Sequence, residues 1–369
     1  MNYWDKETID RIRKGYYSAI YFNRTKYILE QEKNTTPVTM QVFQWNNGSI
    51  LCGIDEVIEL LKVAADKPNT LIINALRDAD TIHRGESVLH ITGPYVYFAH
   101  LESLYLGILA RRTSVATQTR KVVDAAGGKP VFFFADRFDY FANQEGDGYA
   151  AHIGGAAGVC TMAHASRWNG IPVGTIPHAL IAVSDGDTIK ATELFAKYIH
   201  GANIVALVDF DNDCVRTALA VAKALGKKLW GVRLDTASDM IDVSLAGKRK
   251  NKRFYGVNPF LVKLVRIALN NRGYSHVKIL VSGGFNEEKV RRFENEKTPV
   301  DGYGVGSALV HGNNDFTADI VLVNGKNLLN FILKEADISN AQNPDFADSY
   351  LKFLNGLSLF QNYSFMGIE

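Results

Sequence analysis

The sequence has few cysteines and no long apolar or single-charge segment. Its three cysteines, Cys52, Cys160 and Cys214, stand far apart with no CxxC spacing, which predicts a reducing compartment and supplies no metal motif. No window approaches the roughly 18 apolar residues of a membrane span, and the charged N-terminus has no apolar signal core. The net charge of +2, without a run of five like charges, argues against a nucleic-acid surface. We therefore expect a cytoplasmic protein with neither a membrane nor a nucleic-acid partner.

The composition is that of an ordinary globular chain, with 47% hydrophobic and 22% charged residues, and 369 residues exceed one small domain. Apolar spacing predicts helices around 5–16 and 54–65 and strands around 37–45 and 87–92. It also predicts a helix over 98–112, followed by a second helix over 114–128. Thr113 or Ser114 would cap the second helix, and the glycine pair at its end would stop it.

After residue 130, short apolar runs alternate with helix-length segments. Near-continuous apolar runs are typical of strands buried on both faces, so the pattern predicts βα units in a barrel or an open sheet. The runs are 130–137, 171–178, 203–211, 229–235, 277–284 and 301–309. Their C-terminal ends carry, in order, Arg137, His178, Asp209, Arg233 with Asp235, Ser282-Gly283-Gly284, and Gly304, Gly306 and Ser307. In a parallel barrel these ends converge on one mouth, where active sites are built.

The residue types at this mouth indicate a phosphorylated sugar. Glycines after the last two strands let backbone N–H groups approach an anion, as in barrel phosphate sites. Ionised Asp209 and Asp235 accept hydrogen bonds from sugar hydroxyls or bind Mg²⁺. Arg137 and Arg233 offer planar forks for carboxylate or phosphate. His178, whose side chain changes charge near neutral pH, would lie among these groups.

Ten short motifs carry a resemblance to a known family. They are SAIYFNRT (18–25), ITGPY (91–95), HLESLYLGILARRTSVAT (100–117), FADR (134–137), IGGAAGV (153–159), GTIPH (174–178), LVDFD (207–211), GVRLD (231–235), SGG (282–284) and GVGSAL (304–309). In this order, over residues 15–325, the chain resembles nicotinate phosphoribosyltransferase, particularly the shorter archaeal-type enzymes. That family is one of the type II phosphoribosyltransferases, with the quinolinate and nicotinamide enzymes.

The resemblance implies an α/β fold with three parts. These are an N-terminal sandwich-like domain over 1–112, an irregular TIM-like β/α barrel with the phosphoribosyl site over 113–315, and a segment over 316–369 that returns to the N-terminal domain. It also implies synthesis of nicotinate mononucleotide and diphosphate from nicotinate and phosphoribosyl diphosphate, with Mg²⁺ and ATP. The family pairs head to tail with shared sites, so a homodimer is expected.

The motifs also imply roles for single residues. His178 resembles the histidine that ATP phosphorylates, and Thr175 lies in the same motif. Tyr21, from the partner, and Phe134 resemble the pair that stacks on the pyridine ring. Arg137 and Arg233 would contact its carboxylate or a phosphate, and Arg111 matches a position that reaches the neighbouring site in the quinolinate enzyme. Asp235, with Asp209, would hold ribose hydroxyls, and residues 282–284, 304, 306 and 307 would hold the 5′-phosphate.

The sequence departs from the family pattern at two positions, and four alternative functions were considered. Ala19 stands where the family usually has Asp, and Ala157 where relatives tend to have a polar residue. Quinolinate phosphoribosyltransferase is usually shorter and has more basic residues, and the nicotinamide enzyme often reads its amide through an Asp that Ala157 does not supply. A sugar-phosphate lyase or isomerase needs a Lys or Glu at a strand end, which none of the six runs supplies. A non-catalytic paralogue is the fourth alternative, against which the intact His, Arg and Asp set argues.

Overall fold

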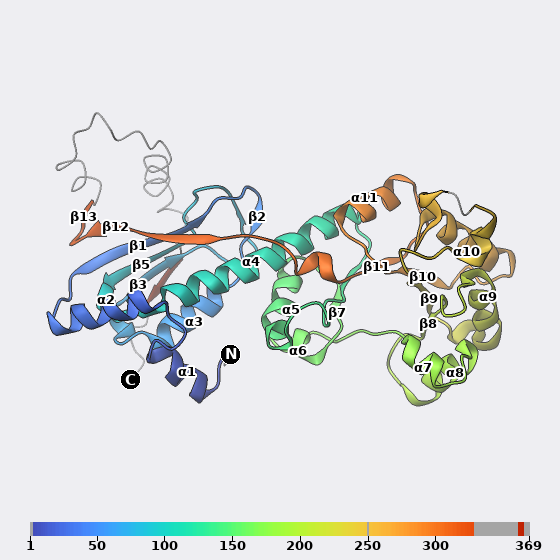
Figure 1. Cartoon of the computed structure of the whole chain (residues 1–369), viewed down its shortest axis with the longest axis horizontal. Helices are drawn as coiled ribbons and strands as arrows, with labels where there is room; N and C mark the ends of the chain where they lie inside the picture. The colour runs from blue at the N-terminus through green and yellow to red at the C-terminus, as the bar shows by residue number, and fades with distance from the viewer. Residues whose placement is uncertain (1–2, 249–250, 328–360, 365–369) are drawn as a thin grey trace. The chain divides into compact units, whose positions relative to one another are not determined.

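The computed structural model describes residues 3–248, 251–327 and 361–364, and the chain divides into two compact units (Figure 1). The first unit comprises residues 1–117 and 313–369, and the second comprises residues 118–312. Helix α4 (Glu102–Ala125) begins in the first unit and ends in the second. Most of the segment predicted to return to the N-terminal domain lies outside the described residues.

The first unit is built on an antiparallel sheet of order β13-β12-β1-β5-β3-β14. Its strands are β1 (Pro37–Gln44), β3 (Ile72–Ala75), β5 (Leu89–Pro94), β12 (Phe316–Val323), β13 (Lys326–Asn327) and β14 (Gln361–Ser364), with a separate pair β2 (Ser49–Ile50) and β4 (Thr81–Ile82). Its helices are α1 (Lys6–Arg13), α2 (Ile20–Gln31), α3 (Ile54–Ala64) and the first part of α4. The helices and strands predicted for residues 5–92 are confirmed, with small shifts at their ends.

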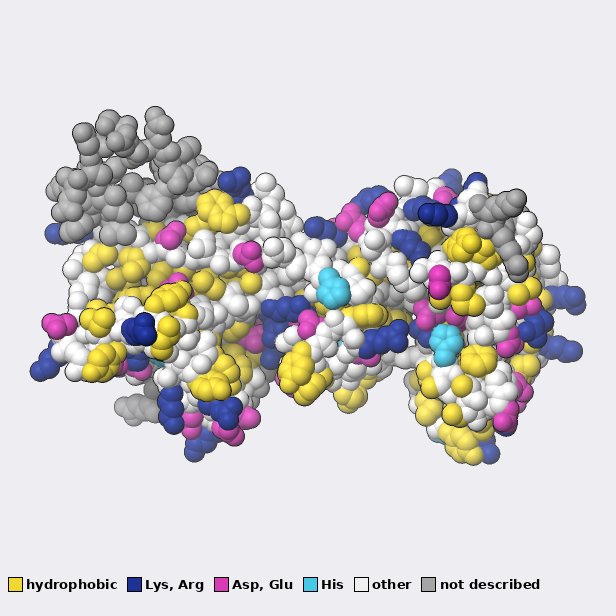
Figure 2. Space-filling model, viewed as in Figure 1, with side chains coloured by type: hydrophobic (Ala, Val, Ile, Leu, Met, Phe, Trp, Pro, Cys, Tyr) yellow, Lys and Arg dark blue, Asp and Glu magenta, His cyan; other side chains and the backbone are white. Residues whose placement is uncertain are grey.

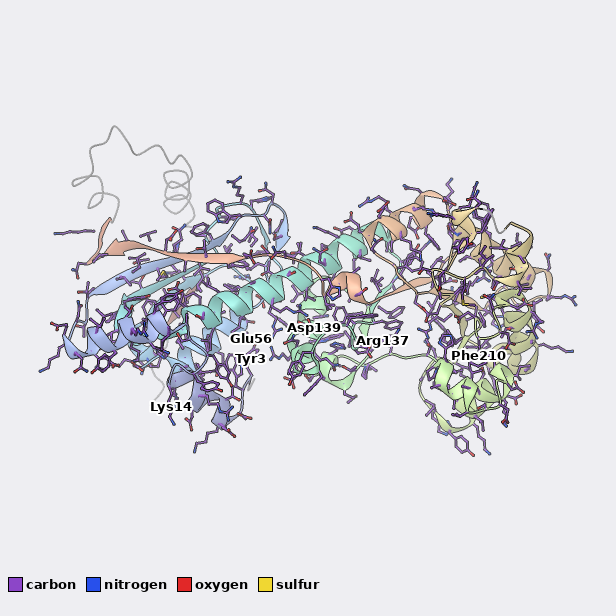
Figure 3. All side chains as sticks on the ribbon, in the orientation of Figure 1. Tyr3, Lys14, Glu56, Arg137, Asp139 and Phe210 are labelled. Carbon is purple, nitrogen blue, oxygen red and sulfur yellow. The ribbon has the colours of Figure 1, made fainter. Side chains whose placement is uncertain are left out.

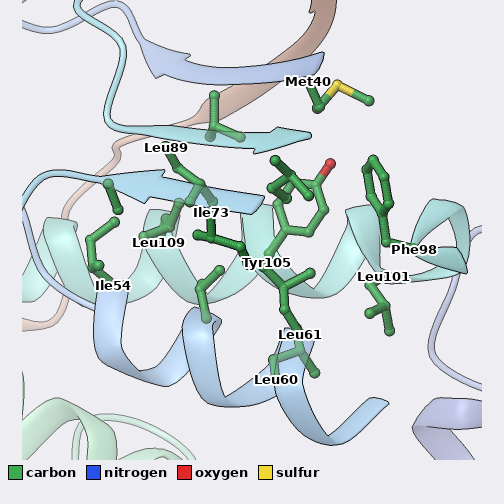
Figure 4. Close-up of a cluster of buried hydrophobic side chains, with 14 of the residues drawn as sticks. Met40, Ile54, Leu60, Leu61, Ile73, Leu89, Phe98, Leu101, Tyr105 and Leu109 are labelled. Atoms are coloured by element: carbon green, nitrogen blue, oxygen red, sulfur yellow. The ribbon is translucent and has the colours of Figure 1, made fainter. Parts of the chain in front are cut away.

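The core of the first unit lies between this sheet, α4 and α3 (Figure 4). Tyr105 and Leu109 are fully buried on one face of α4, because residues four apart lie on the same side of a helix, and Leu101, directly before α4, is buried beside them. They pack in one cluster with Ile73 of the sheet and Leu60 of α3. Burial of each such side chain is worth about 1.5–3 kcal/mol, so this cluster fixes α4 on the sheet.

Helix α4 is continuous, so the predicted break at Thr113 and Ser114 is wrong. The Thr113 hydroxyl is fully buried, accepts from the N–H of Cys52 at 3.1 Å and donates to the carbonyl of Cys52 at 3.2 Å. Thr117 accepts from the N–H of Ile50 at 2.9 Å. These hydroxyls bond a loop that is distant in sequence and do not cap a helix. A local sequence pattern cannot distinguish these two roles. Among the described helices, none is long and apolar enough to cross a membrane.

The second unit is built on a parallel sheet of order β7-β6-β11-β10-β9-β8, which curls as part of a TIM-like barrel (Figure 1). Its strands are β6 (Val131–Phe133), β7 (Gly158–Val159), β8 (Val205–Leu207), β9 (Gly231–Leu234), β10 (Lys278–Val281) and β11 (Gly302–Val305). Its helices are α5 (Gln144–Ile153), α6 (Met162–Ala165), α7 (His178–Ala182), α8 (Thr188–Tyr198), α9 (Cys214–Leu225), α10 (Pro259–Asn271) and α11 (Glu287–Asn295). The predicted α/β fold class is confirmed.

The run 171–178 is not a strand, and here too the prediction is wrong. Val173 donates to the carbonyl of Val159 in β7 at 2.7 Å, and Ile176 donates to the carbonyl of Val205 in β8 at 3.3 Å. The segment therefore runs between the two edge strands of the sheet and links them. Pro172 and Pro177 flank it and have no N–H to donate, so a regular ladder cannot form. His178 consequently begins α7 instead of ending a strand.

Candidate active site

A cavity of about 690 Å³ lies in the second unit at the carboxyl ends of its parallel strands. Most of the predicted site residues line it: Phe134, Arg137, Thr175, His178, Arg233, Asp235, Ser282, Gly283, Gly284, Gly304, Gly306 and Ser307. They come from the ends of four strands, β6, β9, β10 and β11, and from the segment that leads into α7, and they meet because parallel strands end at one edge of the sheet. Asp209 reaches the cavity wall through its contact with His178.

His178 and Asp209 form a dyad with Nε2 and Oδ2 3.3 Å apart. The Asp209 side chain is 6% exposed and its Oδ1 has no protein partner among the described residues, whereas His178 is half exposed. Burial raises the pKa of Asp209, as does Asp235, while His178 lowers it. An ionised carboxylate only accepts hydrogen bonds, so in the contact with ionised Asp209 it is Nε2 that donates.

Arg233 and Asp235 lie at the end of β9 with opposite charges. Burial lowers the pKa of the Arg233 guanidinium, which Asp235 and Asp209 counteract, and its Nε has no partner in the described part of the chain. Asp235 accepts from the Ser282 hydroxyl, with Oδ1 2.7 Å from Oγ. A buried guanidinium with an unused donor next to an oriented carboxylate is suited to hold an anionic, hydroxyl-bearing ligand.

The aromatic wall of the cavity depends on glycines. A Cβ at Gly304 would lie 2.6 Å from the ring of Phe134, and a Cβ at Gly306 would lie 2.3 Å from the ring of Phe138. Glycine is therefore required at both positions for the two rings to stand where they do. Arg137 follows β6 and its guanidinium lies 5.4 Å from the centre of the Phe138 ring (Figure 3). The arrangement places a cation beside apolar faces that fit a flat ring.

Besides Asp209, two predicted site residues are not among those that line this cavity. Tyr21 lies on α2 in the first unit, where its side chain is 60% exposed and its ring centre is 4.2 Å from that of Phe22. Arg111 lies on α4, also in the first unit. The roles predicted for Tyr21 and Arg111 involve a second copy of the chain, so both stay predictions.

Several cavity residues were not predicted from sequence. Asp136 accepts from the thiol of Cys160, with Oδ1 3.1 Å from Sγ, and burial together with Asp136 raises the pKa of that thiol to about 12. Cys160 is thus a hydrogen-bond donor and not a thiolate nucleophile. Phe138 and Phe285 complete the apolar lining. Asp136 stands between Phe134 and Arg137 in the FADR motif, which was a signal for it; no sequence pattern marks Cys160.

Three kinds of comparison relate the chain to known proteins. Residues 19–113 match the family model described as quinolinate phosphoribosyl transferase, N-terminal domain. A nicotinate phosphoribosyltransferase of Mycobacterium tuberculosis is 30% identical over 256 residues, which cover 68% of this chain and 52% of that protein. The chain thus spans about half the length of the curated relatives it matches.

Solved structures extend the match to most of the chain. A nicotinate-nucleotide pyrophosphorylase from Pyrococcus furiosus is 36% identical with a TM-score of 0.75, over 88% of this chain and 79% of that one. Human nicotinic acid phosphoribosyltransferase is 15% identical with a TM-score of 0.65, over 84% of this chain and 75% of that one, which shows the shared fold.

Proposed function

The chain belongs to the nicotinate phosphoribosyltransferase family, and we propose that it forms nicotinate mononucleotide and diphosphate from nicotinate and phosphoribosyl diphosphate. The observation that carries this proposal is the cavity itself, in which two arginines, an oriented aspartate, two glycine loops and aromatic rings line one space. Each feature matches one part of the two substrates: the carboxylate and phosphates, the ribose hydroxyls, and the flat pyridine ring.

The geometry of the cavity supports one role for each of these groups. Phe134 offers a ring face to nicotinate, while Arg137 or Arg233 pairs with its carboxylate. Asp235, held by Ser282, accepts from ribose hydroxyls and stabilises the positive charge that develops on the sugar as diphosphate leaves. The loops of Gly283-Gly284 and Gly306-Ser307 offer backbone N–H groups to the 5′-phosphate. The protein mainly positions the ring nitrogen against the anomeric carbon.

ATP coupling through His178 is part of the same proposal. With its Nε2–H on Asp209, the imidazole keeps Nδ1 as the nucleophile, so the γ-phosphoryl group of ATP would be transferred to Nδ1 with release of ADP. Asp209 would then balance the positive charge of the phosphorylated ring. Thr175, three residues before His178, lines the same cavity and offers a hydroxyl.

Mg²⁺ fits the cavity as an ion carried mainly by the diphosphate. Among the described residues, no group of three or more His, Cys, Asp or Glu side chains could form a metal cage by itself. Mg²⁺ commonly binds through one or two carboxylates together with water and substrate phosphates. Asp209, whose Oδ1 has no protein partner among the described residues, and Asp235 would hold it, because Asp235 raises the pKa of Asp209 and a cation would offset that repulsion. The ion would screen the charge of the departing diphosphate.

A homodimer with shared sites is supported by an exposed apolar surface on the first unit. Tyr16, Tyr17, Ile20, Tyr21, Tyr27 and Ile28 are all exposed within 13 residues. Figure 2 shows hydrophobic side chains gathered where α2 lies. A cluster of exposed apolar side chains of this kind is typical of a surface that binds another molecule. A second copy that covers α2 would bring Tyr21 to a partner cavity as a stacking ring.

The decisive experiment is incubation of the purified protein with phosphoribosyl diphosphate, Mg²⁺, ATP and one pyridine at a time, with diphosphate and mononucleotide measured. Nicotinate should be the preferred acceptor. Quinolinate is the second candidate, favoured by the family model of residues 19–113, but its two ring carboxylates would have to share Arg137 and Arg233. Turnover of quinolinate or nicotinamide alone would replace the nicotinate assignment, and turnover of none would refute the proposal.

A further inference from the structure

Helix α11 contains a lysine where an acidic residue would be favoured. The Asn286 side chain caps α11 by accepting from the backbone N–H of Lys289 at 2.9 Å, so Lys289 is the third helical residue. Glu287 and Glu288 suit the partial positive charge of this terminus, whereas a cation there is unfavourable. A lysine in this position therefore calls for a compensating contact of its side chain.

That contact is with the glycine loop of the cavity. The Lys289 Nζ donates to the carbonyl of Gly283 at 2.8 Å and lies 4.2 Å from the ring centre of Phe285, which is 3% exposed. The charged groups that act on Lys289 are Arg292 of its own helix and Asp235 from the end of β9. Burial, with a smaller contribution from Arg292, lowers the pKa of Lys289 to about 8, and Asp235 opposes the shift.

The hydrogen bond fixes the direction of a peptide plane. The Gly283 carbonyl and the Gly284 N–H belong to one planar trans peptide and point in opposite directions. Both glycines line the cavity, with φ of +89° and +63°, a conformation that glycine adopts at little cost. Lys289 is not part of the cavity lining, so it draws the carbonyl toward α11. In the described ranges no protein acceptor is paired with the Gly284 N–H.

We propose that Lys289 is a positioning residue that turns the Gly284 N–H toward the phosphate of the phosphoribosyl substrate by holding the Gly283 carbonyl. The inference rests on the proposed function for the identity of the anion. Because Lys289 lies outside the lining, it is not placed to attack a substrate carbonyl, in contrast to the lysine of a Schiff-base enzyme. Its effect should appear in substrate binding, since the phosphate is remote from the bond that breaks.

The test compares three variants with ribose 5-phosphate as the probe. Lys289→Met removes the donor, and Lys289→Arg keeps a donor that stays protonated. Lys263→Met is the matched control, because Lys263 also donates to a backbone carbonyl, that of Glu296 at 3.0 Å, on the surface of α10. Calorimetric titration at pH 7 should show about tenfold weaker binding for Lys289→Met, near-native binding for Lys289→Arg and no change for Lys263→Met. The KM for phosphoribosyl diphosphate should rise in parallel while kcat changes by less than about twofold.

The pH dependence gives a readout that a purely structural role would not produce. Ribose 5-phosphate is a dianion above about pH 7, so a change in affinity above that value reports the protein. Wild-type binding should weaken as pH rises through about 8, because Lys289 loses its charge there. Lys289→Arg should bind without that decline, and Lys289→Met should bind weakly throughout. The wild-type measurement needs no variant, so it stands even if Lys289→Met fails to fold.

Two results separate this inference from the proposed function. Transfer to a pyridine with unchanged KM in folded Lys289→Met, or a wild-type affinity for ribose 5-phosphate that is flat from pH 7 to about 9.5, would overturn the role of Lys289 and leave the function standing. Lys289-dependent binding of ribose 5-phosphate without transfer to any pyridine would refute the function and support the role of Lys289 in anion binding.

Discussion

Replacing Asp209 by Asn should reduce activity while leaving the protein at least as stable. The substitution keeps the shape of the side chain and removes its charge, beside a histidine whose Nε2 is 3.3 Å from Oδ2. In the proposed reaction that charge stabilises the positive imidazole formed when Nδ1 takes up a phosphoryl group. A hydrogen bond to a charged group contributes about 1.5–3 kcal/mol, so phosphorylation of His178 should slow roughly 10- to 150-fold.

The stability change has the opposite sign because Asp209 is costly to bury as an anion. Burial raises its pKa above the ordinary value of 3.8, so the native state binds the proton more tightly than the unfolded chain does. The free energy of unfolding therefore falls as pH rises through the pKa of folded Asp209, and the full cost is present above that pKa. Removing the charge should recover about 1 kcal/mol, or roughly 2–4 °C in the unfolding midpoint of a unit this size. The advantage of Asn should shrink as pH falls toward 3.8.

The assay has two readouts and an internal control. Phosphohistidine at residue 178 is measured by mass spectrometry at neutral pH after exposure to ATP, and unfolding is followed by heat at several pH values. The control is Asp211→Asn, two residues along the same motif, where an exposed carboxylate pairs with Arg216 at 2.9 Å. Asp211→Asn should leave phosphorylation unchanged. The reasoning is refuted if Asp209→Asn phosphorylates at the wild-type rate, or if it unfolds well below both wild type and the control.

Three further predictions concern separate parts of the molecule. Thr113→Val should lower the free energy of unfolding by about 1–3 kcal/mol, seen in chemical denaturation, because the buried N–H and C=O of Cys52 lose their partner. Asp235→Ala should cost about 2–4 kcal/mol in kcat/KM while circular dichroism shows a native fold; an active or an unfolded variant would assign Asp235 a structural role. Inactive Tyr21→Ala and His178→Ala chains should regain activity when mixed and reassembled, and an active monomer in sedimentation would contradict the shared site.

The sequence was most informative where the fold imposes a short-range pattern. Parallel strands are buried on both faces, so each reads as an apolar run, and the first residue free of that constraint is the one at its carboxyl end. Asp209, Asp235 and Ser282 were found in this way, and the structure brings Asp235 and Ser282 into a hydrogen bond. The sequence pattern was enough to predict these site residues, because the carboxyl ends of the strands meet at one edge in every parallel sheet.

The sequence pattern could not predict contacts between residues that lie far apart along the chain. Thr113 lies inside α4, and its hydroxyl bonds a residue 61 positions away. The sequence does not show that distant partner, so Thr113 was predicted to cap a helix. The segment 171–178 has the composition of a strand, yet its two prolines leave it only isolated bonds to its neighbours. Cys160 joins the site through Asp136, which is 24 residues distant. The sequence does show that the positive charge of Lys289 is unfavourable at the N-terminus of α11. It does not show that the side chain binds the carbonyl of Gly283.

The structure also assigns a place to both departures from the family. Ala19 is the N-cap of α2 and makes no side-chain cap, and its backbone N–H instead donates to the Ser103 hydroxyl at 3.1 Å. An Asp at position 19 would accept a hydrogen bond from an N-terminal N–H of α2. Its replacement by Ala therefore removes a cap from the helix that carries Tyr21. Ala157 precedes β7 and is not part of the cavity lining. Neither alanine is among the residues that line the described cavity, whereas a chain that had lost catalysis would be free to lose Asp235 or Arg233. The retained pair, a buried Arg233 whose charge is disfavoured by burial and an Asp235 oriented by Ser282, is the reason to expect an active enzyme.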